Sequence, residues 1–262
     1  MRILPSWLAC LMLAGKALAN NPAAPPAELV FAVRPIPPYM EPSPDGYRGA
    51  HIDIMHALAK RLGVKLKLQE CPTVRCLQML EEGKVDVSMG FAREPSREAY
   101  LYFVQPPYAS PTKTLFYLRK QETRTLSKLS ELGEFKVGLV RGVFYTDALT
   151  AIPESQKDYA PDMESNFRKL VAGRIDVVPA GINVGTRVIE KLSLEADVKP
   201  AQLSHVVNTE RFISLSRASP WFAHRQLIER EFTHMINSNL VSTILNRYEE
   251  GLRSRPAIPS SK

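Results

Sequence analysis

Arginine and aromatic side chains at the ends of predicted strands are the residues of this sequence best suited to bind a ligand. The arginines are Arg34, Arg93, Arg97 and Arg141, and the rings near them are Tyr39, Phe91, Phe144 and Tyr145. A guanidinium can donate two parallel hydrogen bonds to a carboxylate. This set therefore suits an acidic or aromatic carboxylate without an amine. For an individual arginine the alternative is a solvated position in a loop.

Motifs for metal binding and nucleophilic catalysis are missing from the sequence. The chain has 5 His and 3 Cys, and this supply does not form a four-ligand zinc site. His51 and His56, for example, would lie about 140° apart around a helix. No Gly-x-Ser-x-Gly or phosphate-binding loop occurs, and Asp86 and Asp176 are interpreted as structural. We therefore expect no catalytic residue, no metal and no cofactor.

The composition is that of a globular protein. The chain has 262 residues, of which 45% are hydrophobic and 23% charged, with a formal net charge of +7. This length suffices for one large domain or for two smaller ones with their own cores. The basic residues are interleaved with acids and form no run of four or more. We therefore expect no nucleic-acid partner.

Residues 1–19 have the pattern of a secretory signal peptide. A charged start at Arg2 is followed by an apolar stretch of about a dozen residues and an Ala-x-Ala site ending at Ala19. The apolar stretch is too short for a membrane span, and a buried N-terminal helix is the alternative. No later segment is long and apolar enough to span a bilayer. The sequence predicts a soluble periplasmic protein without direct membrane insertion.

Two cysteines remain after the predicted leader, Cys71 and Cys76. In an oxidising compartment this pair predicts a disulfide that closes a short loop, and two buried thiols are the alternative. A thioredoxin-type redox pair has two intervening residues, whereas four lie between these cysteines. The pair is therefore interpreted as structural, fixing the entry to the helix that follows.

Alternating strand and helix patterns predict an α/β fold. The continuous apolar run at 29–33 indicates a buried strand. The elements predicted after it are a helix at 52–62, a strand at 64–68, a helix at 74–82 and a strand at 85–89. The segment 80–87, Leu-x-x-Gly-Lys-Val-Asp-Val, returns at 170–177 as Leu-x-x-Gly-Arg-Ile-Asp-Val. This repeat indicates two similar lobes, and chance similarity of a common helix–Gly–strand unit is the alternative.

The rest of the chain fits the two lobes. The elements predicted there are a strand at 137–140, helices at 145–151 and 163–172, a strand at 212–216 and helices at 220–236 and 240–248. The last three are too small to bury a core alone, so they complete the first lobe. We expect lobe I to hold 28–109 and 211–250, lobe II to hold 110–210, and 251–262 to form a flexible tail. A crevice between lobes joined by two linkers is the natural ligand site.

Eight short motifs occur in order along the chain. They are Pro-Pro-Tyr at 37–39, Gly-x-x-Gly-x-x-Ile-Asp-Ile at 46–54, Leu-x-x-Gly-Lys-Val-Asp at 80–86, Pro-x-Arg-Glu at 95–98, Phe-x-x-Pro-x-Tyr at 103–108, Lys-Val-Gly at 136–138, Gly-Arg-Ile-Asp at 173–176 and a final helix through Tyr248. Together they resemble the bacterial extracellular solute-binding proteins of family 3, the periplasmic amino-acid-binding class. The resemblance covers the chain from Leu29 to Tyr248.

This resemblance implies a two-lobed type II periplasmic-binding-protein fold that closes on a small polar solute and passes it to an inner-membrane ABC permease. We also expect a monomer. In the family, the arginine of the Pro-x-Arg segment binds the α-carboxylate of the ligand, and Arg97 occupies that position. The alternative is that Arg97 begins a helix and pairs with Glu94 or Glu98.

The chain departs from the family's amino-acid-binding pattern. Where family members carry hydroxyl residues before the arginine, this chain has the segment 90–92, Gly-Phe-Ala, and its second-lobe helix begins Gly-Val-Phe at 142–144. Gly181 stands where the family has the acid that receives the ligand's ammonium, and a buried ammonium without an anionic partner is costly. The expected ligand is a small carboxylated solute, amino-acid-like or an organic acid. The predicted ligand-binding residues are Arg34, Tyr39, Phe91, Ala92, Arg97, Arg141, Phe144 and Gly181.

Two rival functions stay open. The same fold hosts cyclohexadienyl dehydratase-like enzymes, which would need a general acid in the cleft, and Glu41 and Glu94 are the nearby carboxylates. A periplasmic sensor or accessory subunit that binds another protein is the second rival.

Overall fold

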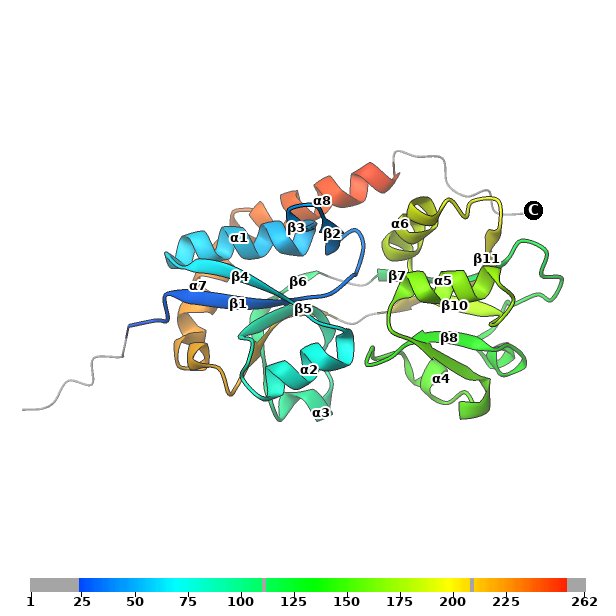
Figure 1. Cartoon of the computed structure of the whole chain (residues 1–262), viewed down its shortest axis with the longest axis horizontal. Coiled ribbons are helices and arrows are strands. Elements are labelled where there is room, and N and C mark those ends of the chain that lie inside the picture. The colour runs from blue at the N-terminus through cyan, green and yellow to red at the C-terminus, as the bar shows by residue number, and fades with distance from the viewer. Residues whose placement is uncertain (1–23, 110–111, 208–209, 254–262) are drawn as a thin grey trace, which may run out of the picture.

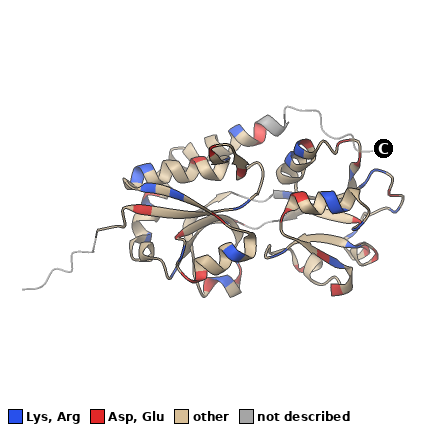
Figure 2. Ribbon diagram, in the orientation of Figure 1, with Lys and Arg blue, Asp and Glu red and all other residues tan. Residues whose placement is uncertain are grey.

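The computed structural model describes residues 24–109, 112–207 and 210–253. The predicted signal peptide at 1–19 and residues 254–262 of the predicted tail lie outside these residues. Within them, no helix is long and apolar enough to cross a membrane. Lysines, arginines and acids are distributed over the ribbon of both halves of the molecule (Figure 2).

Two five-stranded sheets lie side by side and define two lobes (Figure 1). The sheet of lobe I has the order β4 (Lys65–Glu70), β1 (Glu28–Val33), β5 (Val87–Ala92), β12 (Arg211–Ser216) and β6 (Leu101–Ala109). The sheet of lobe II has the order β11 (Val198–Val207), β7 (Thr112–Arg119), β10 (Val177–Gly181), β8 (Val137–Val140) and β9 (Lys157–Ala160). A small hairpin, β2 (Glu41–Ser43) and β3 (Gly46–Arg48), precedes the first helix.

The chain passes between the sheets twice, from β6 to β7 and from β11 to β12. The two passages lie side by side, since Arg211 pairs with Ala109 in one sheet and Val207 pairs with Thr112 in the other. A double connection of this kind allows two lobes to rotate about one hinge.

Helices cover both faces of each sheet (Figure 1). Lobe I carries α1 (Ala50–Leu62), α2 (Thr73–Glu81), α3 (Pro95–Glu98), the 3₁₀ turn η3 (Pro220–His224), α7 (Arg225–Asn237) and α8 (Leu240–Arg253). Lobe II carries η1 (Leu129–Glu134), α4 (Asp147–Thr150), η2 (Glu154–Gln156), α5 (Met163–Val171) and α6 (Ile182–Leu192). Helix α8 belongs to lobe I but also contacts α6 of lobe II.

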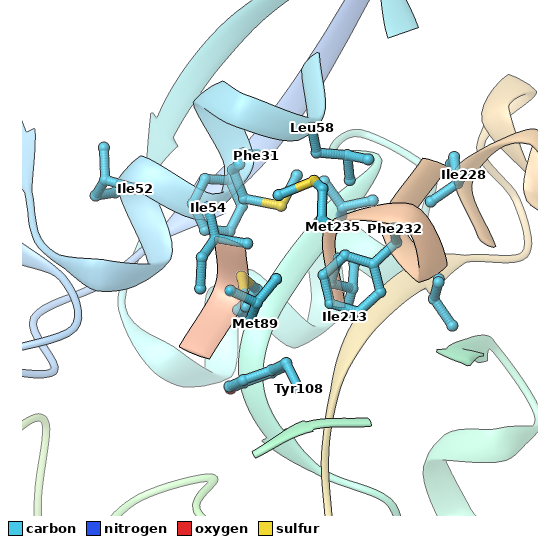
Figure 3. Packing of buried hydrophobic residues seen from close by; sticks show 14 of the residues in the cluster. Phe31, Ile52, Ile54, Leu58, Met89, Tyr108, Ile213, Ile228, Phe232 and Met235 are labelled. Carbon is cyan, nitrogen blue, oxygen red and sulfur yellow. The ribbon is translucent and has the colours of Figure 1, made fainter. Parts of the chain in front are cut away.

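The core of lobe I forms where α1 and α7 pack on the sheet. Phe31 of β1, Met89 of β5 and Ile213 of β12 meet Leu58 of α1 and Phe232 of α7, and all five are fully buried. Figure 3 shows these side chains in contact across the sheet–helix boundary. This packing holds the ends of β1, β5 and β12 in fixed relative positions.

The repeated Gly-basic-apolar-Asp unit has the same structural role in both lobes. Gly83 and Gly173 follow α2 and α5 with φ of 68° and 71°, which is left-handed backbone that glycine adopts without strain. The carboxylate of Asp86 accepts a hydrogen bond from Val30 N, and that of Asp176 accepts one from Lys136 N. Each aspartate therefore ties its helix–strand unit to the neighbouring parallel strand.

Two predicted helices differ from those observed. The helix expected at 220–236 is divided into η3 and α7, because the Ser219 side chain accepts from Trp221 N and starts a tight turn. This turn places the buried Trp221 so that its indole donates to Glu28 O. The helix expected at 145–151 shrinks to α4, because the Tyr145 hydroxyl accepts from Val140 N and keeps the chain before α4 irregular.

Candidate ligand-binding site between the lobes

A cavity of about 1310 Å³ lies between the two lobes. Its walls come from the ends of strands in both sheets: Arg34 follows β1, Cys71 follows β4, Arg211 begins β12 and Gly181 ends β10. The carboxyl edges of parallel strands are a common location for ligands in α/β proteins. The fold therefore brings the loops of both lobes to one enclosed space.

Arg34 is the most unusual group in the cavity wall. It is only 2% exposed, and its Nη1 donates to Ser88 Oγ and Met89 O, both at 3.2 Å. Its guanidinium carbon lies 3.7 Å from the centroid of the Phe91 ring, a cation–π contact. Burial lowers the pKa of Arg34 to about 9, so it is still a cation at neutral pH. Among the described residues no carboxylate pairs with it.

His51 and Tyr108 form the neutral part of the same wall. The His51 ring stacks on Tyr39 at 5.0 Å and meets Tyr108 edge-on at 5.2 Å. Burial, with the charges of Arg34 and Arg211, lowers the pKa of His51 to about 3. Burial likewise raises the pKa of Tyr108 to about 12. Both side chains are therefore uncharged at neutral pH and do not balance the arginines.

Contacts between side chains connect the lobes across the cavity. Tyr39 Oη donates to Glu249 Oε1 at 3.2 Å and accepts from Asn183 Nδ2 at 3.0 Å. The carboxylate of Glu41 in lobe I accepts from Arg187 Nε at 2.6 Å and from Nη2 at 3.2 Å, which is a two-bond ion pair with lobe II. Burial alone would raise the pKa of Glu41, but the hydrogen bonds and charge of Arg187 hold it below its usual value.

Arg97 lies outside the wall of this cavity. It is 6% exposed, forms an ion pair with Glu94, and donates from Nη1 to Ala92 O at 3.3 Å. Its Nη2 donates to Gly142 O of lobe II at 3.0 Å. The pairing with Glu94 is the alternative that the sequence left open for this arginine. Arg97 here joins the lobes beside a second, smaller cavity of about 340 Å³.

The other sequence-predicted residues divide into those that line the main cavity and those that do not. Tyr39, Ala92, Phe144 and Gly181 line it, together with Arg34. Phe91 is buried behind the wall beneath Arg34. Arg141 is exposed and lies over the Tyr159 ring at 5.2 Å.

Gly181 and the disulfide also belong to the rim of the cavity. Gly181 is the N-cap of α6, and a Cβ added there would meet no atom within 4 Å. The predicted disulfide between Cys71 and Cys76 is confirmed, with Cα atoms 5.3 Å apart. It ties the end of β4 to the first turn of α2, where Thr73 approaches Gly142 of lobe II.

Sequence reasoning missed three groups of this site. The sequence marks Arg211 only as the first residue of the second part of lobe I, although a basic residue beside a linker lies next to the crevice. The spacing of His51 and His56 speaks only to metal binding, and nothing in the sequence around Arg187 indicates its partner Glu41.

Known structures share this architecture. A histidine kinase sensor domain with similarity to periplasmic binding proteins is 18% identical, with a TM-score of 0.75 over 86% of this chain and 96% of that one. An ancestral arginine-binding protein bound to arginine is 20% identical, with a TM-score of 0.74 over 85% and 98% of the two chains. An ancestral amino acid-binding protein described as a precursor of cyclohexadienyl dehydratase is 20% identical, with a TM-score of 0.69 over 85% and 96%.

These likenesses confirm the expected fold class, an α/β type II periplasmic-binding-protein fold. No curated protein matches the sequence. Residues 29–248 match bacterial extracellular solute-binding proteins, family 3, which confirms the resemblance carried by the short motifs. The chain belongs to this family of solute-binding proteins.

Proposed function

We propose that this protein is a periplasmic receptor that closes on a small carboxylated solute and delivers it to an ABC-type importer. The observation that carries the proposal is Arg34, a buried cation in the cavity wall without a carboxylate partner among the described residues. A buried charge without a counter-charge is strongly unfavourable. A carboxylate placed in the cavity beside Arg34 would remove that penalty and gain charge-assisted hydrogen bonds.

The surroundings of Arg34 favour a ligand with apolar or ring-shaped parts. Tyr39, His51 and Tyr108 present neutral faces at the same end of the cavity. Gly181 supplies no acid for a ligand ammonium. The ligand supported best is an organic acid rather than a free α-amino acid.

A dehydratase-like activity is less well supported. A general acid requires a carboxyl group whose pKa is raised toward neutral pH. Arg187 instead holds the pKa of Glu41 below its usual value, and Glu94 forms an ion pair with Arg97. The two carboxylates considered for this role therefore act as ion-pair partners between or within the lobes.

The ligand proposal is tested by thermal unfolding of the purified protein in a library of organic acids and amino acids. A solute that binds only the folded state raises the melting temperature of the protein. A free solute concentration of about 100 times Kd stabilises the folded state by about 2.7 kcal/mol. We expect carboxylates to give this shift in the wild type and not in Arg34→Met. Arg75→Met replaces an exposed arginine on α2 and should keep the shift.

A library in which carboxylates never change the melting temperature, or an Arg34→Met variant that binds them as the wild type does, would refute the assignment. The transport role is tested separately by uptake of the identified solute in cells with and without the gene.

A further inference from the structure

Two arginines from different strands line the same cavity. Arg34 follows β1 and Arg211 begins β12, and only β5 separates these strands in the sheet. Neighbouring strands lie about 4.8 Å apart, so the two backbone positions are roughly 10 Å apart. The charge of Arg211 acts on Arg34, His51 and Tyr108, which places it at the same end of the cavity.

Neither arginine has an acidic partner. Within residues 24–109, 112–207 and 210–253, the hydrogen bonds of Arg34 go to Ser88 and Met89, and no ion pair involves Arg211. The residues outside these ranges contain no aspartate or glutamate. Every aspartate and glutamate of this sequence therefore lies within the described residues.

Five acids line the cavity; four of them have other partners, and the fifth, Glu195, is exposed to solvent. Asp162 accepts from Ser165 N at the start of α5, and Glu70 accepts from the hydroxyl of Tyr47. Glu190 pairs with Arg187, and Glu249 accepts from Tyr39. The cavity therefore has two positive charges at one end, and its four hydrogen-bonded acids interact with groups other than these two arginines.

We infer that the ligand carries two anionic groups, one bound by Arg34 and the other by Arg211, with its middle part against the rings of His51 and Tyr108. The chemical class is a small dicarboxylate. This inference rests on the proposed function of the cavity and goes beyond it, because one carboxylate neutralises the buried Arg34, and a second gives the half-buried Arg211 a counter-charge and charge-assisted hydrogen bonds.

The test compares dicarboxylates with their half-amides, which have the same shape and one charge fewer. The series runs from succinate and succinamate to adipate and adipamate, with affinity measured by calorimetry on the purified protein. We expect the wild type to bind the best dicarboxylate at least tenfold more tightly than its half-amide. Arg211→Gln should bring the two affinities within about twofold of each other.

Two further variants separate charge from structure. Arg211→Lys keeps the positive charge and should retain most of the preference for two carboxylates, and Arg75→Gln should retain all of it. A wild type that binds the half-amide as tightly as the diacid would overturn the inference while leaving the carboxylate receptor intact. A preference that survives in Arg211→Gln would remove Arg211 from the site. Failure of every mono- and dicarboxylate to bind would overturn both proposals.

Discussion

Replacing Arg34 with methionine should make the empty protein more stable while removing ligand binding. Methionine is unbranched like the arginine stem and apolar, and although it is about two bonds shorter it fills most of the same buried space without a charge. Arg34 is 2% exposed, and burial is the main cause of its lowered pKa of about 9. The folded state therefore carries a cost for this cation that the unfolded chain does not.

The size of the effect follows from that shift. Each pKa unit corresponds to 1.36 kcal/mol, so the lowering of the Arg34 pKa to about 9 amounts to roughly 5 kcal/mol. Methionine loses the bonds to Ser88 and Met89 O and the contact with Phe91, each worth about 1 kcal/mol. The expected net gain is about 2 kcal/mol, or a melting temperature about 4–8 °C higher.

Unfolding by heat and by urea measures this gain, with Arg75→Met as the control that should change stability by less than about 0.5 kcal/mol.

The pH dependence of this gain in stability has a definite sign. The folded pKa lies below the unfolded one, so the cost is complete below pH 9 and decreases as the pH rises above it. The advantage of the variant should be constant from pH 6 to pH 8 and smaller at pH 10. A variant less stable than the wild type at pH 7 would refute the reasoning.

The remaining predictions concern the contacts between the lobes and the missing acid. Glu41→Gln weakens the two-bond ion pair with Arg187 and should reduce ligand affinity about tenfold by making closure less favourable. The control Glu154→Gln, at an exposed position, should leave the affinity unchanged. Equal affinities of the wild type and Glu41→Gln would show that this ion pair does not contribute to closure. Because the folded pKa of Glu41 lies below its usual value, its contribution is present above about pH 4.5 and is lost as the pH falls through the folded pKa, which a titration of affinity in acid should show. Gly181→Asp places a carboxylate at the open N-cap of α6 and should improve binding of an amino acid relative to its deaminated analogue; an unchanged ratio would show that this position does not reach the ligand.

Much of the architecture was predictable because it depends on local patterns. The apolar run before Arg34 and the strand at 137–140 were found as expected, since buried parallel strands have continuous apolar sequences. The disulfide was predictable because an oxidising compartment was expected and the two cysteines lie five residues apart. The division of the helix at 220–236 was not, because it depends on the tertiary contact that buries Trp221 against Glu28.

The residue types at the candidate site were predictable from the sequence, but the contacts between their side chains were not. A sequence shows that Arg34 and Arg97 both follow the ends of strands, but it does not show which one has an acid beside it. Glu94 is three residues from Arg97 and forms an ion pair with it, whereas no carboxylate of the described residues pairs with Arg34. The pair of Glu41 and Arg187 spans 146 residues, beyond any local pattern.

The hydrogen bond from Arg97 to the Gly142 carbonyl has a further consequence for how the receptor distinguishes full from empty. It contributes to closing the lobes without any atom from a solute. A receptor whose own groups support closure visits the closed shape before a solute arrives, so less of the solute's binding free energy is spent on moving the lobes. The affinity for the solute is then higher, but the closed conformation is a less reliable sign that a solute is bound. In the transport role proposed above, a membrane partner that recognises only closed receptors would meet some empty ones and would dock with them unproductively.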